Sequence, residues 1–199
     1  NPKVLAGNGI EFQTVSFTYE GAEKKALDTV TFTVPAGSTV ALVGPSGGGK
    51  TTAASLIPRF WDVDSGSVAV GGVDVREIDP KVLMQQVAFV FQNNRLFKTT
   101  ILENVRASRP EATREEVLRA LEAAQCSDII EKMPNGVDTI IGTHGTFLSG
   151  GEQQRIALAR AILKDAPIVV LDEATAFADP ENEVLIQKAF AKLTQGRTV

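Results

Sequence analysis

The sequence predicts an α/β fold: helices around a largely parallel sheet, an antiparallel β subdomain at the N-terminus and an α-helical subdomain in the middle. Three observations lead to this class. Residues 10–37 alternate like strands of an antiparallel sheet, short apolar runs of strand length recur further along, and helix-like segments separate those runs. The chain has 199 residues, which is enough to bury a sizeable core.

The predicted strands are recognised by their composition. Segments 10–19 and 26–37 are rich in Val, Thr and Phe and are separated by a polar stretch, so they predict the edge of an antiparallel sheet. Residues 38–44 (STVALVG) form a continuous apolar run, which predicts a fully buried strand of a parallel sheet. Further strands are expected at residues 67–72, 87–91 and 167–173.

The predicted helices carry local start and stop signals. A helix is expected directly after the Gly-rich loop, and residues 100–164 are expected to be mostly helical. Segment 113–124 begins with a capping box, Thr113 followed by Glu116, and segment 149–165 begins with Ser at a plausible N-cap. Segment 180–196 has Pro at its start and Gly at its end.

Composition and charge disfavour some classes of partner and environment. The formal net charge of −4 argues against nucleic acid as the main partner, because there is no excess of basic residues to neutralise phosphates. The single cysteine, Cys126, allows no intrachain disulfide, so a reducing compartment is expected. No apolar run approaches the roughly 20 residues of a membrane helix, so this chain is not expected to cross a membrane by itself.

Residues 44–51 match the phosphate-loop pattern G-x-x-x-x-G-K-[ST], with a predicted strand before and a predicted helix after. Glycines let backbone N–H groups turn toward the phosphates, and the helix N-terminus adds partial positive charge. This context disfavours the alternative of a flexible Gly-rich turn, and the expected core is that of a RecA-like P-loop NTPase. The expected nucleotide-binding residues are Gly44, Pro45, Ser46, Gly47, Gly48, Gly49, Lys50, Thr51 and Thr52.

Two polar residues of this loop and two acidic residues further along the chain have expected roles. Lys50 is predicted to reach the β- and γ-phosphates and the Thr51 hydroxyl to ligate Mg²⁺. The apolar run 168–171 ends in Asp172, which is expected beside Thr51 to hold the Mg²⁺ shell, and Glu173 is placed to act as general base on an attacking water. An ordinary strand end is the alternative interpretation, and the phosphate loop makes it the weaker one.

Residues 148–155 (LSGGEQQR) predict a second anion site. Ser149 followed by two glycines at a helix start offers exposed N–H groups, a hydroxyl and no bulky side chain. On this chemistry alone a merely capped helix stays open. The octet, however, resembles the signature motif of ATP-binding cassette (ABC) ATPases, and the resemblance covers nearly the entire chain, with the motifs in the family's order.

The resemblance implies roles for further residues. Tyr19 matches the aromatic residue that stacks on adenine, with packing on the core as the alternative. Gln92 matches the glutamine that contacts Mg²⁺ and the attacking water, and Asp179 matches the acidic residue that communicates between two ATP sites. The resemblance thus implies catalytic roles for Glu173, Lys50 and Gln92 and metal binding by Thr51, Gln92 and Asp172.

The family's architecture implies the cofactors and the first partner. In ABC ATPases the phosphate loop of one protomer is completed by the signature of another, so two chains enclose two molecules of ATP with Mg²⁺. The expected partner is therefore a second nucleotide-binding domain, identical or different, and a single chain is expected to hydrolyse ATP weakly. The residues that would reach across are Ser149, Gly150, Gly151 and Glu152.

Two segments resemble exporter-type cassettes, namely residues 93–106 and 133–151. The resemblance implies a transmembrane domain as second partner, a place at the cytoplasmic face of the cell membrane and membrane contact only through that domain. Two positions depart from the pattern. Thr143 stands where a Glu is common, and residues 176–179 (AFAD) replace the usual Ser-Ala-Leu-Asp.

The whole of residues 1–199 is expected to form one such domain, C-terminally incomplete. Residues 1–92 and 160–199 would form the catalytic core with the β subdomain, and 93–159 the helical subdomain. Residues 195–199 look like the entry to another strand, after which the family has a histidine that contacts the γ-phosphate. His144 precedes the signature and is expected to be a solvated loop residue.

Two other functions stay open as alternatives. One is a soluble ABC ATPase of iron–sulfur assembly, repair or translation, which the absence of membrane helices in or beside the native polypeptide would favour. The other is a nucleotide-binding regulator with little turnover. The presence of Glu173 disfavours the regulator, whereas the absence from this sequence of the histidine that contacts the γ-phosphate favours it.

Overall fold

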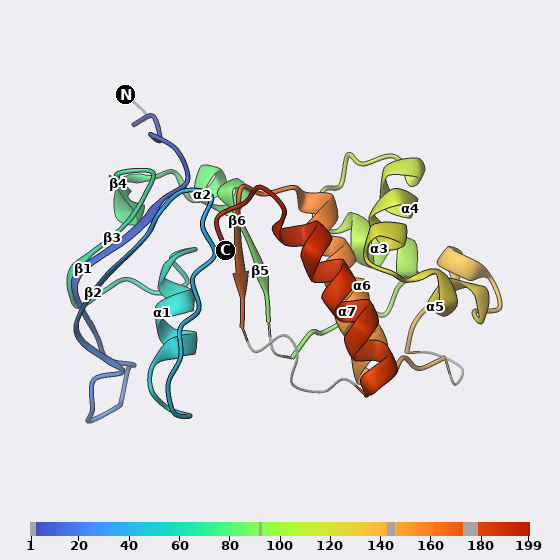
Figure 1. Ribbon diagram of the computed structural model, residues 1–199, viewed down its shortest axis with the longest axis horizontal. Coiled ribbons are helices and arrows are strands. Elements are labelled where there is room, and N and C mark those ends of the chain that lie inside the picture. The colour runs from blue at the N-terminus through green and yellow to red at the C-terminus, as the bar shows by residue number, and fades with distance from the viewer. Residues whose placement is uncertain (1–2, 92, 143–145, 173–178) are drawn as a thin grey trace. The chain divides into compact units, whose positions relative to one another are not determined.

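The computed structural model describes residues 3–91, 93–142, 146–172 and 179–199 (Figure 1). The chain forms two compact units built from interleaved segments. The first unit consists of Asn1–Ala88, Pro167–Val170 and Gly196–Val199, and the second of Phe89–Ala166 and Leu171–Gln195. The finer division expected from the sequence, with a helical subdomain over residues 93–159, remains a prediction.

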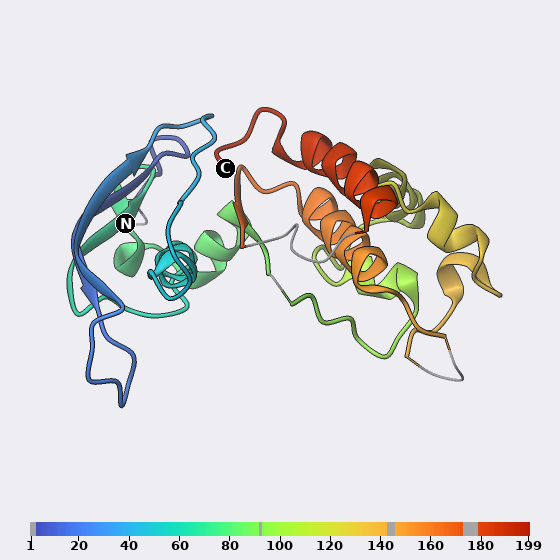
Figure 2. The same ribbon diagram turned by 60° about the horizontal axis from the view of Figure 1, so that its bottom comes forward.

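An antiparallel sheet dominates the first unit, as predicted. Its strand order is β2-β1-β3-β4, and Phe12 of β1 pairs with Phe32 of β2, their rings stacked 4.3 Å apart. The helix α1 lies on the concave side of this sheet in both views (Figures 1 and 2). The bounds are β1 Ile10–Phe17, β2 Leu27–Val34, α1 Lys50–Leu56, β3 Ser65–Val70, β4 Val73–Asp74, the 3-10 turn η1 Val75–Glu77 and α2 Pro80–Gln86.

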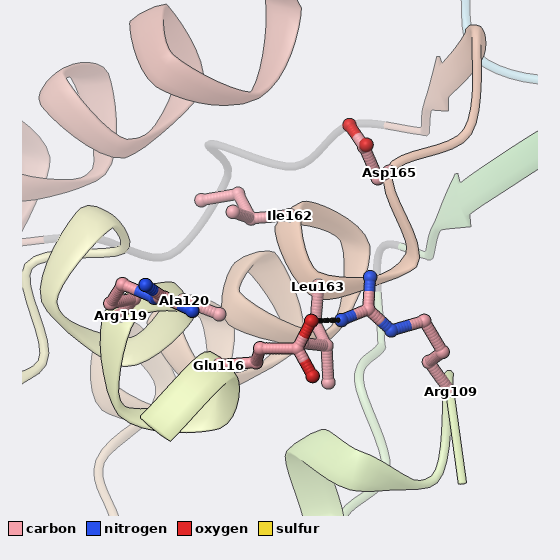
Figure 3. A pocket seen from close by; sticks show the side chains of 7 residues that line it. All are labelled: Arg109, Glu116, Arg119, Ala120, Ile162, Leu163 and Asp165. Atoms are coloured by element: carbon pink, nitrogen blue, oxygen red, sulfur yellow. Dashed lines mark hydrogen bonds and ion pairs between the residues drawn. The ribbon is translucent and has the colours of Figure 1, made fainter. Parts of the chain in front are cut away.

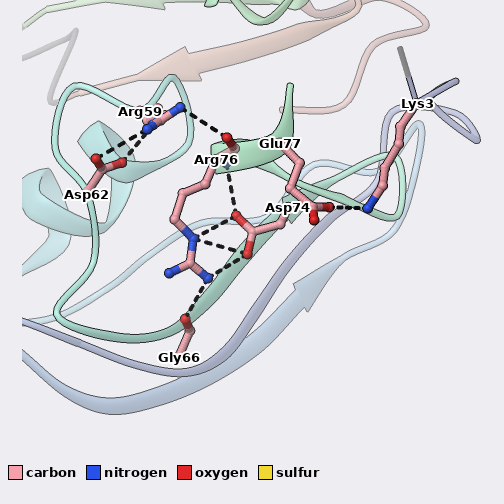
Figure 4. Close-up of polar contacts among 7 residues, drawn as sticks. All are labelled: Lys3, Arg59, Asp62, Gly66, Asp74, Arg76 and Glu77. Atoms are coloured by element: carbon pink, nitrogen blue, oxygen red, sulfur yellow. Dashed lines mark hydrogen bonds and ion pairs between the residues drawn. The ribbon is translucent and has the colours of Figure 1, made fainter. Parts of the chain in front are cut away.

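A chain of polar contacts holds the connection between α1 and β3 (Figure 4). Arg76 donates to the Asp74 carboxylate at 2.6 Å and to the carbonyl of Gly66 at 3.1 Å. Arg59, whose φ is +58°, donates to Asp62 at 2.6 Å and to the carbonyl of Arg76. Such half-exposed ion pairs contribute little stability individually, so their main effect is to set the path of the chain after α1.

The predicted buried strand at residues 38–44 is wrong for this structure. Val40, Leu42 and Val43 are 38%, 41% and 92% exposed. The backbone N–H of Val40 donates to the carbonyl of Val199, and the N–H of Val199 donates to the carbonyl of Ser38, whereas residues 41–44 pair with no strand in the described part of the chain. An apolar run becomes a buried strand only where neighbouring strands pair with it, and composition does not supply the neighbour.

The second unit is mainly helical. Its central helix, α6, runs side by side with α7 in both views, and Ile156 and Leu158 of α6 are completely buried (Figure 2). The strands β5 and β6 pair in a two-stranded sheet, and each has residues in both units. Within the first unit, Ile168 of β6 forms a parallel bridge with Thr198. The bounds are β5 Val87–Val90, α3 Ile101–Arg106, α4 Arg114–Ala123, α5 Ser127–Glu131, the 3-10 turn η2 Gly136–Asp138, α6 Gly150–Lys164, β6 Ile168–Leu171 and α7 Pro180–Thr194.

The local helix signals predicted from the sequence are confirmed. Both Thr113 and Ser149 form complete capping boxes with the glutamate three residues later. Pro180 occupies the first turn of α7, and Gly196, with φ of +71°, follows its end. Within the described ranges no helix has the length and apolarity that a bilayer span requires.

Cys126 is completely buried in the second unit, and burial raises the pKa of its thiol to about 12. At pH 8 the native protein therefore holds almost no thiolate, which is the form that attacks alkylating reagents. We expect iodoacetamide to leave Cys126 unmodified in the native protein and to label it after unfolding in urea. Rapid labelling of the native protein, followed by mass spectrometry, would contradict this burial.

Candidate nucleotide-binding site

Three glycines of the phosphate loop, Gly47, Gly48 and Gly49, occupy positions that disfavour a side chain. Gly47 and Gly49 have φ of +77° and +85°, in the left-handed region that glycine adopts at no steric cost. A Cβ at Gly49 would lie 2.5 Å from the carbonyl oxygen of Ala26, and one at Gly48 would lie 2.9 Å from that of Pro45. Residues 44–48 are exposed, so their backbone groups are accessible to a ligand.

Lys50 begins α1 and folds its side chain back over the loop. Its Nζ donates to the carbonyl oxygens of Gly44 and Pro45, at 2.8 Å each. The ammonium group therefore lies at the mouth of the loop that the glycines shape. A phosphate group that entered this loop would meet a positive charge and no opposing carboxylate from the loop itself.

Tyr19 lies beside the same helix. Its hydroxyl is hydrogen-bonded to the Oγ1 of Thr52 at 2.8 Å, and the residue is 36% exposed. Phe17 and Trp61 contact the ring edge-on, with centroids 4.9 and 5.7 Å away. The tyrosine predicted to stack on adenine is thus fixed next to the phosphate loop. Trp61 was not predicted as part of the site, because nothing in its local sequence pattern signals this contact.

The acidic partner of the loop is only partly described. Asp172 directly follows β6, and its backbone N–H donates to the carbonyl of Val90 on β5 at 3.0 Å. The predicted general base Glu173, the predicted metal ligand Gln92, and Thr143 and His144 lie outside the described residues. The metal-binding role of Thr51 and Asp172 therefore remains a prediction.

The signature residues start α6 in the second unit. The Ser149 hydroxyl accepts from the backbone N–H of Glu152, and the Glu152 carboxylate accepts from the N–H of Ser149 at 2.9 Å. Lys132 forms an ion pair with the other oxygen of this buried glutamate. The negative charge next to the helix start is thus compensated, and no hydrogen bond from another described residue occupies the N–H groups of Gly150 and Gly151.

A polar network that the sequence analysis missed lies behind the signature. Arg155 is 1% exposed and makes a double hydrogen bond with Asp128, at 2.6 and 3.0 Å. It also donates to the side chain of Asn182, which in turn donates to Asp179, the acidic residue singled out from the sequence. These partners lie up to 27 residues apart, so no sequence pattern could have linked them.

A hollow of about 260 Å³ lies elsewhere in the second unit, between α4 and the end of α6 (Figure 3). The Glu116 carboxylate spans it to reach Arg109, and Glu116 also caps α4 through Thr113. Two of the charged groups at its wall, Glu116 and Arg109, thus already pair with each other. We assign no ligand to this hollow.

These features are typical of a nucleotide-binding domain with a phosphate loop. They are the glycine-rich loop with its lysine, the aromatic ring beside that loop, and a separate helix that starts with Ser and two glycines. A family model described as ABC transporter matches residues 27–176, and the chain belongs to that family. It has the P-loop NTPase fold and is an ATP-binding ATPase domain of exporter type. The geometry of the phosphate loop fits ATP, because glycines have no side chain and so leave the backbone N–H groups accessible to the phosphates.

Similar proteins are much longer than this chain. The ATP-dependent lipid A-core flippase of Vibrio vulnificus (strain YJ016) is 50% identical over 191 residues, which are 96% of this chain and 33% of the flippase. The flippase of the same name from Salmonella typhimurium is 50% identical over 194 residues, 97% of this chain and 33% of that protein.

A solved structure of a bacterial Atm1-family ABC exporter with ATP bound superposes with a TM-score of 0.90 and 38% identity. The match covers 99% of this chain and 34% of the exporter. The chain therefore spans about a third of the length of the relatives it matches.

Proposed function

We propose that the chain is the motor domain of an exporter-type ABC transporter, and that two such domains enclose two molecules of Mg-ATP. The observation that carries the proposal is that one chain bears both halves of a composite site. The first unit holds a complete phosphate loop, and the second presents Ser149, Gly150 and Gly151 at a helix start. Two copies could therefore complete each other's sites.

Each residue of the site has a chemical role in this proposal. Lys50 neutralises charge on the β- and γ-phosphates, and Tyr19 stacks on the adenine. Thr51, Gln92 and Asp172 hold Mg²⁺, which neutralises the phosphate oxygens when bound. Glu173 accepts a proton from the water that attacks the γ-phosphate, so that ADP and phosphate leave separately.

The incoming signature supplies the remaining contacts and excludes water. Ser149 donates its hydroxyl proton and Gly150 and Gly151 their N–H groups to the phosphate held by the partner chain. Because Glu152 is paired with Lys132, its carboxylate does not repel the incoming anion. In a lone chain the phosphate loop lacks the signature of a partner, so turnover per chain should be weak and should fall on dilution.

The remaining part of the transporter would be a transmembrane domain, and this nucleotide-binding domain would contact it at the cytoplasmic face of the membrane. Support comes from the relatives, which are a flippase and an exporter about three times as long as this chain. The hydrolysis performed here would then drive movement of a substrate that the membrane domain selects. Substrate identity would accordingly depend on residues outside this chain.

The test is ATP-dependent dimerisation of the Glu173→Gln variant, measured by light scattering during gel filtration with and without Mg-ATP. The substitution removes the general base and keeps the phosphate loop, so we expect a stable dimer only with nucleotide. Adding Ser149→Ala should abolish that dimer, because it removes a hydroxyl from each of the two sites.

Ser149 also caps α6, and losing a cap costs about 1 kcal/mol of helix stability. Thr113→Ala is the matched control, because Thr113 forms the same capping box on α4 outside the proposed site. We expect the control to dimerise normally. A Glu173→Gln protein that binds ATP and stays monomeric at every concentration would contradict the two-site proposal for identical chains.

A further inference from the structure

Asn182 joins three parts of the second unit through one side chain. Its Oδ1 accepts from Nη2 of the buried Arg155 at 2.9 Å, and its Nδ2 donates to Asp179 Oδ2 at 2.9 Å. Its backbone N–H donates to the other carboxylate oxygen, Asp179 Oδ1, also at 2.9 Å. One residue of α7 therefore holds both oxygens of Asp179 and the guanidinium of α6.

The Asp179 carboxylate is anionic in this setting. Hydrogen bonds from the backbone and then the side chain of Asn182 lower its pKa from the ordinary value. Asp179 itself is exposed and directly follows residues 173–178, which begin with the proposed general base. Asn182 thus controls the orientation of an exposed, charged residue that lies six positions after Glu173 in the chain.

The same side chain touches the signature motif. A Cβ placed on Gly151 would lie 2.8 Å from Asn182 Cγ and 2.9 Å from its Cβ, closer than real carbon atoms approach. Position 151 can therefore carry only hydrogen while Asn182 stands where it does. This contact gives a packing reason for the second glycine of the signature, separate from any contact with phosphate.

The anchor of the arrangement is rigid. Arg155 is 1% exposed, makes two hydrogen bonds to Asp128 and donates to the carbonyl of Gln125 at 2.5 Å. A guanidinium held by several partners in a fixed plane leaves Asn182 one orientation that satisfies it. Displacing the signature helix would consequently displace Asn182, and Asp179 with it.

We propose that Asn182 is a positioning residue that locks the signature helix start to Asp179, so that both reach the composite ATP site together. The inference rests on the proposed function, in which the signature completes the partner's site. It adds that the two elements do not adjust independently, because a single amide connects them. In this proposal the amide acts through Arg155, Gly151 and Asp179 and not by binding nucleotide or metal itself.

The test uses Asn182→Asp in the Glu173→Gln background. The aspartate side chain keeps an oxygen for Arg155 but has no N–H for Asp179 Oδ2, and its negative charge repels that carboxylate. The variant therefore breaks the side-chain link to Asp179 and leaves only the backbone N–H bond to Asp179 Oδ1. We expect the protein concentration needed for ATP-dependent dimerisation to rise by about tenfold. ATP affinity of the monomer should stay within about twofold of the parent, because the phosphate loop is untouched.

Two further variants separate positioning from stability. Gln187→Ala on the exposed face of α7 is the control and should dimerise like the parent. Gly151→Ala forces a methyl group against Asn182 and should also weaken dimerisation. Asn182→Ala and Gly151→Ala act at the same contact. The double variant should therefore dimerise no less tightly than whichever of these two single variants dimerises less tightly.

The outcomes are distinct. A Glu173→Gln parent that never dimerises overturns the proposed function and this inference with it. A parent that dimerises, together with an Asn182→Asp variant that dimerises at the same concentration, overturns the inference alone. So does an Asn182→Asp variant whose dimerisation falls only in proportion to a lower unfolding midpoint, since that would be a purely structural effect.

Discussion

Replacing Lys50 by methionine is expected to lower ATP turnover by about two to three orders of magnitude. The two side chains have similar length, so the substitution removes the charge with little change in volume. In the structure the ammonium lies over the carbonyls of Gly44 and Pro45, at the mouth of the loop. Without it, negative charge that develops on the phosphates during hydrolysis loses its nearest cation within the loop.

The measurement is phosphate release at saturating ATP and high protein concentration, with binding followed separately by the fluorescence of Trp61. This residue is the only tryptophan in the sequence, and it contacts Tyr19 beside the proposed adenine position. Lys81→Met, an exposed lysine of α2, is the control and should keep full turnover. A loss of less than about tenfold for Lys50→Met would mean that another group carries the charge stabilisation.

Replacing Arg155 by alanine is expected to lower the free energy of unfolding by about 3–5 kcal/mol. The side chain is completely enclosed, so its removal leaves a cavity. It also leaves the carbonyl of Gln125 and the amide of Asn182 without their donor. Urea unfolding followed by circular dichroism measures the change.

Arg114→Ala is the matched control for this substitution. Arg114 also makes two hydrogen bonds to one aspartate, Asp138, but the two side chains are 45% and 52% exposed. An exposed pair of this kind contributes at most about 1 kcal/mol. An equal decrease in the free energy of unfolding for Arg155→Ala and Arg114→Ala would show that burial does not determine how much these ion pairs stabilise the protein.

The Arg155 effect should also depend on pH. Arg155 holds the pKa of Asp128 below its usual value, chiefly by its hydrogen bonds to the carboxylate. A carboxyl group with a lowered folded-state pKa contributes stability above its unfolded pKa and loses it as the pH falls through the folded pKa. The difference in the free energy of unfolding between the unsubstituted protein and Arg155→Ala should therefore become smaller below about pH 4.

Much of the fold and site follows from short-range patterns. The capping box at Thr113, the N-cap at Ser149, the proline start of α7 and the antiparallel strands were predicted correctly, because each depends on residues within a few positions. The phosphate loop was recognised for the same reason. Its lysine and glycines are spaced by the geometry of one turn around a phosphate.

The long-range features could not be predicted in this way. The run 38–44 has the composition of a buried strand, and its exposure here depends on which strands lie next to it. The bond between Tyr19 and Thr52 joins residues 33 positions apart, and the Arg155–Asn182 bond joins residues 27 apart. Nothing local distinguishes Asn182 from any other polar residue in the first turn of a helix.

The sequence by itself determined the chemistry of this protein, namely a phosphate loop with its lysine and a signature serine followed by two glycines. Backbone torsion and capping act over one turn, so the residue types and their spacing are sufficient to specify such motifs. Only the tertiary structure decided how the signature is held. Asn182 fills the space beside Gly151 and grips Asp179 because packing brings α6 and α7 together, and packing depends on the whole chain.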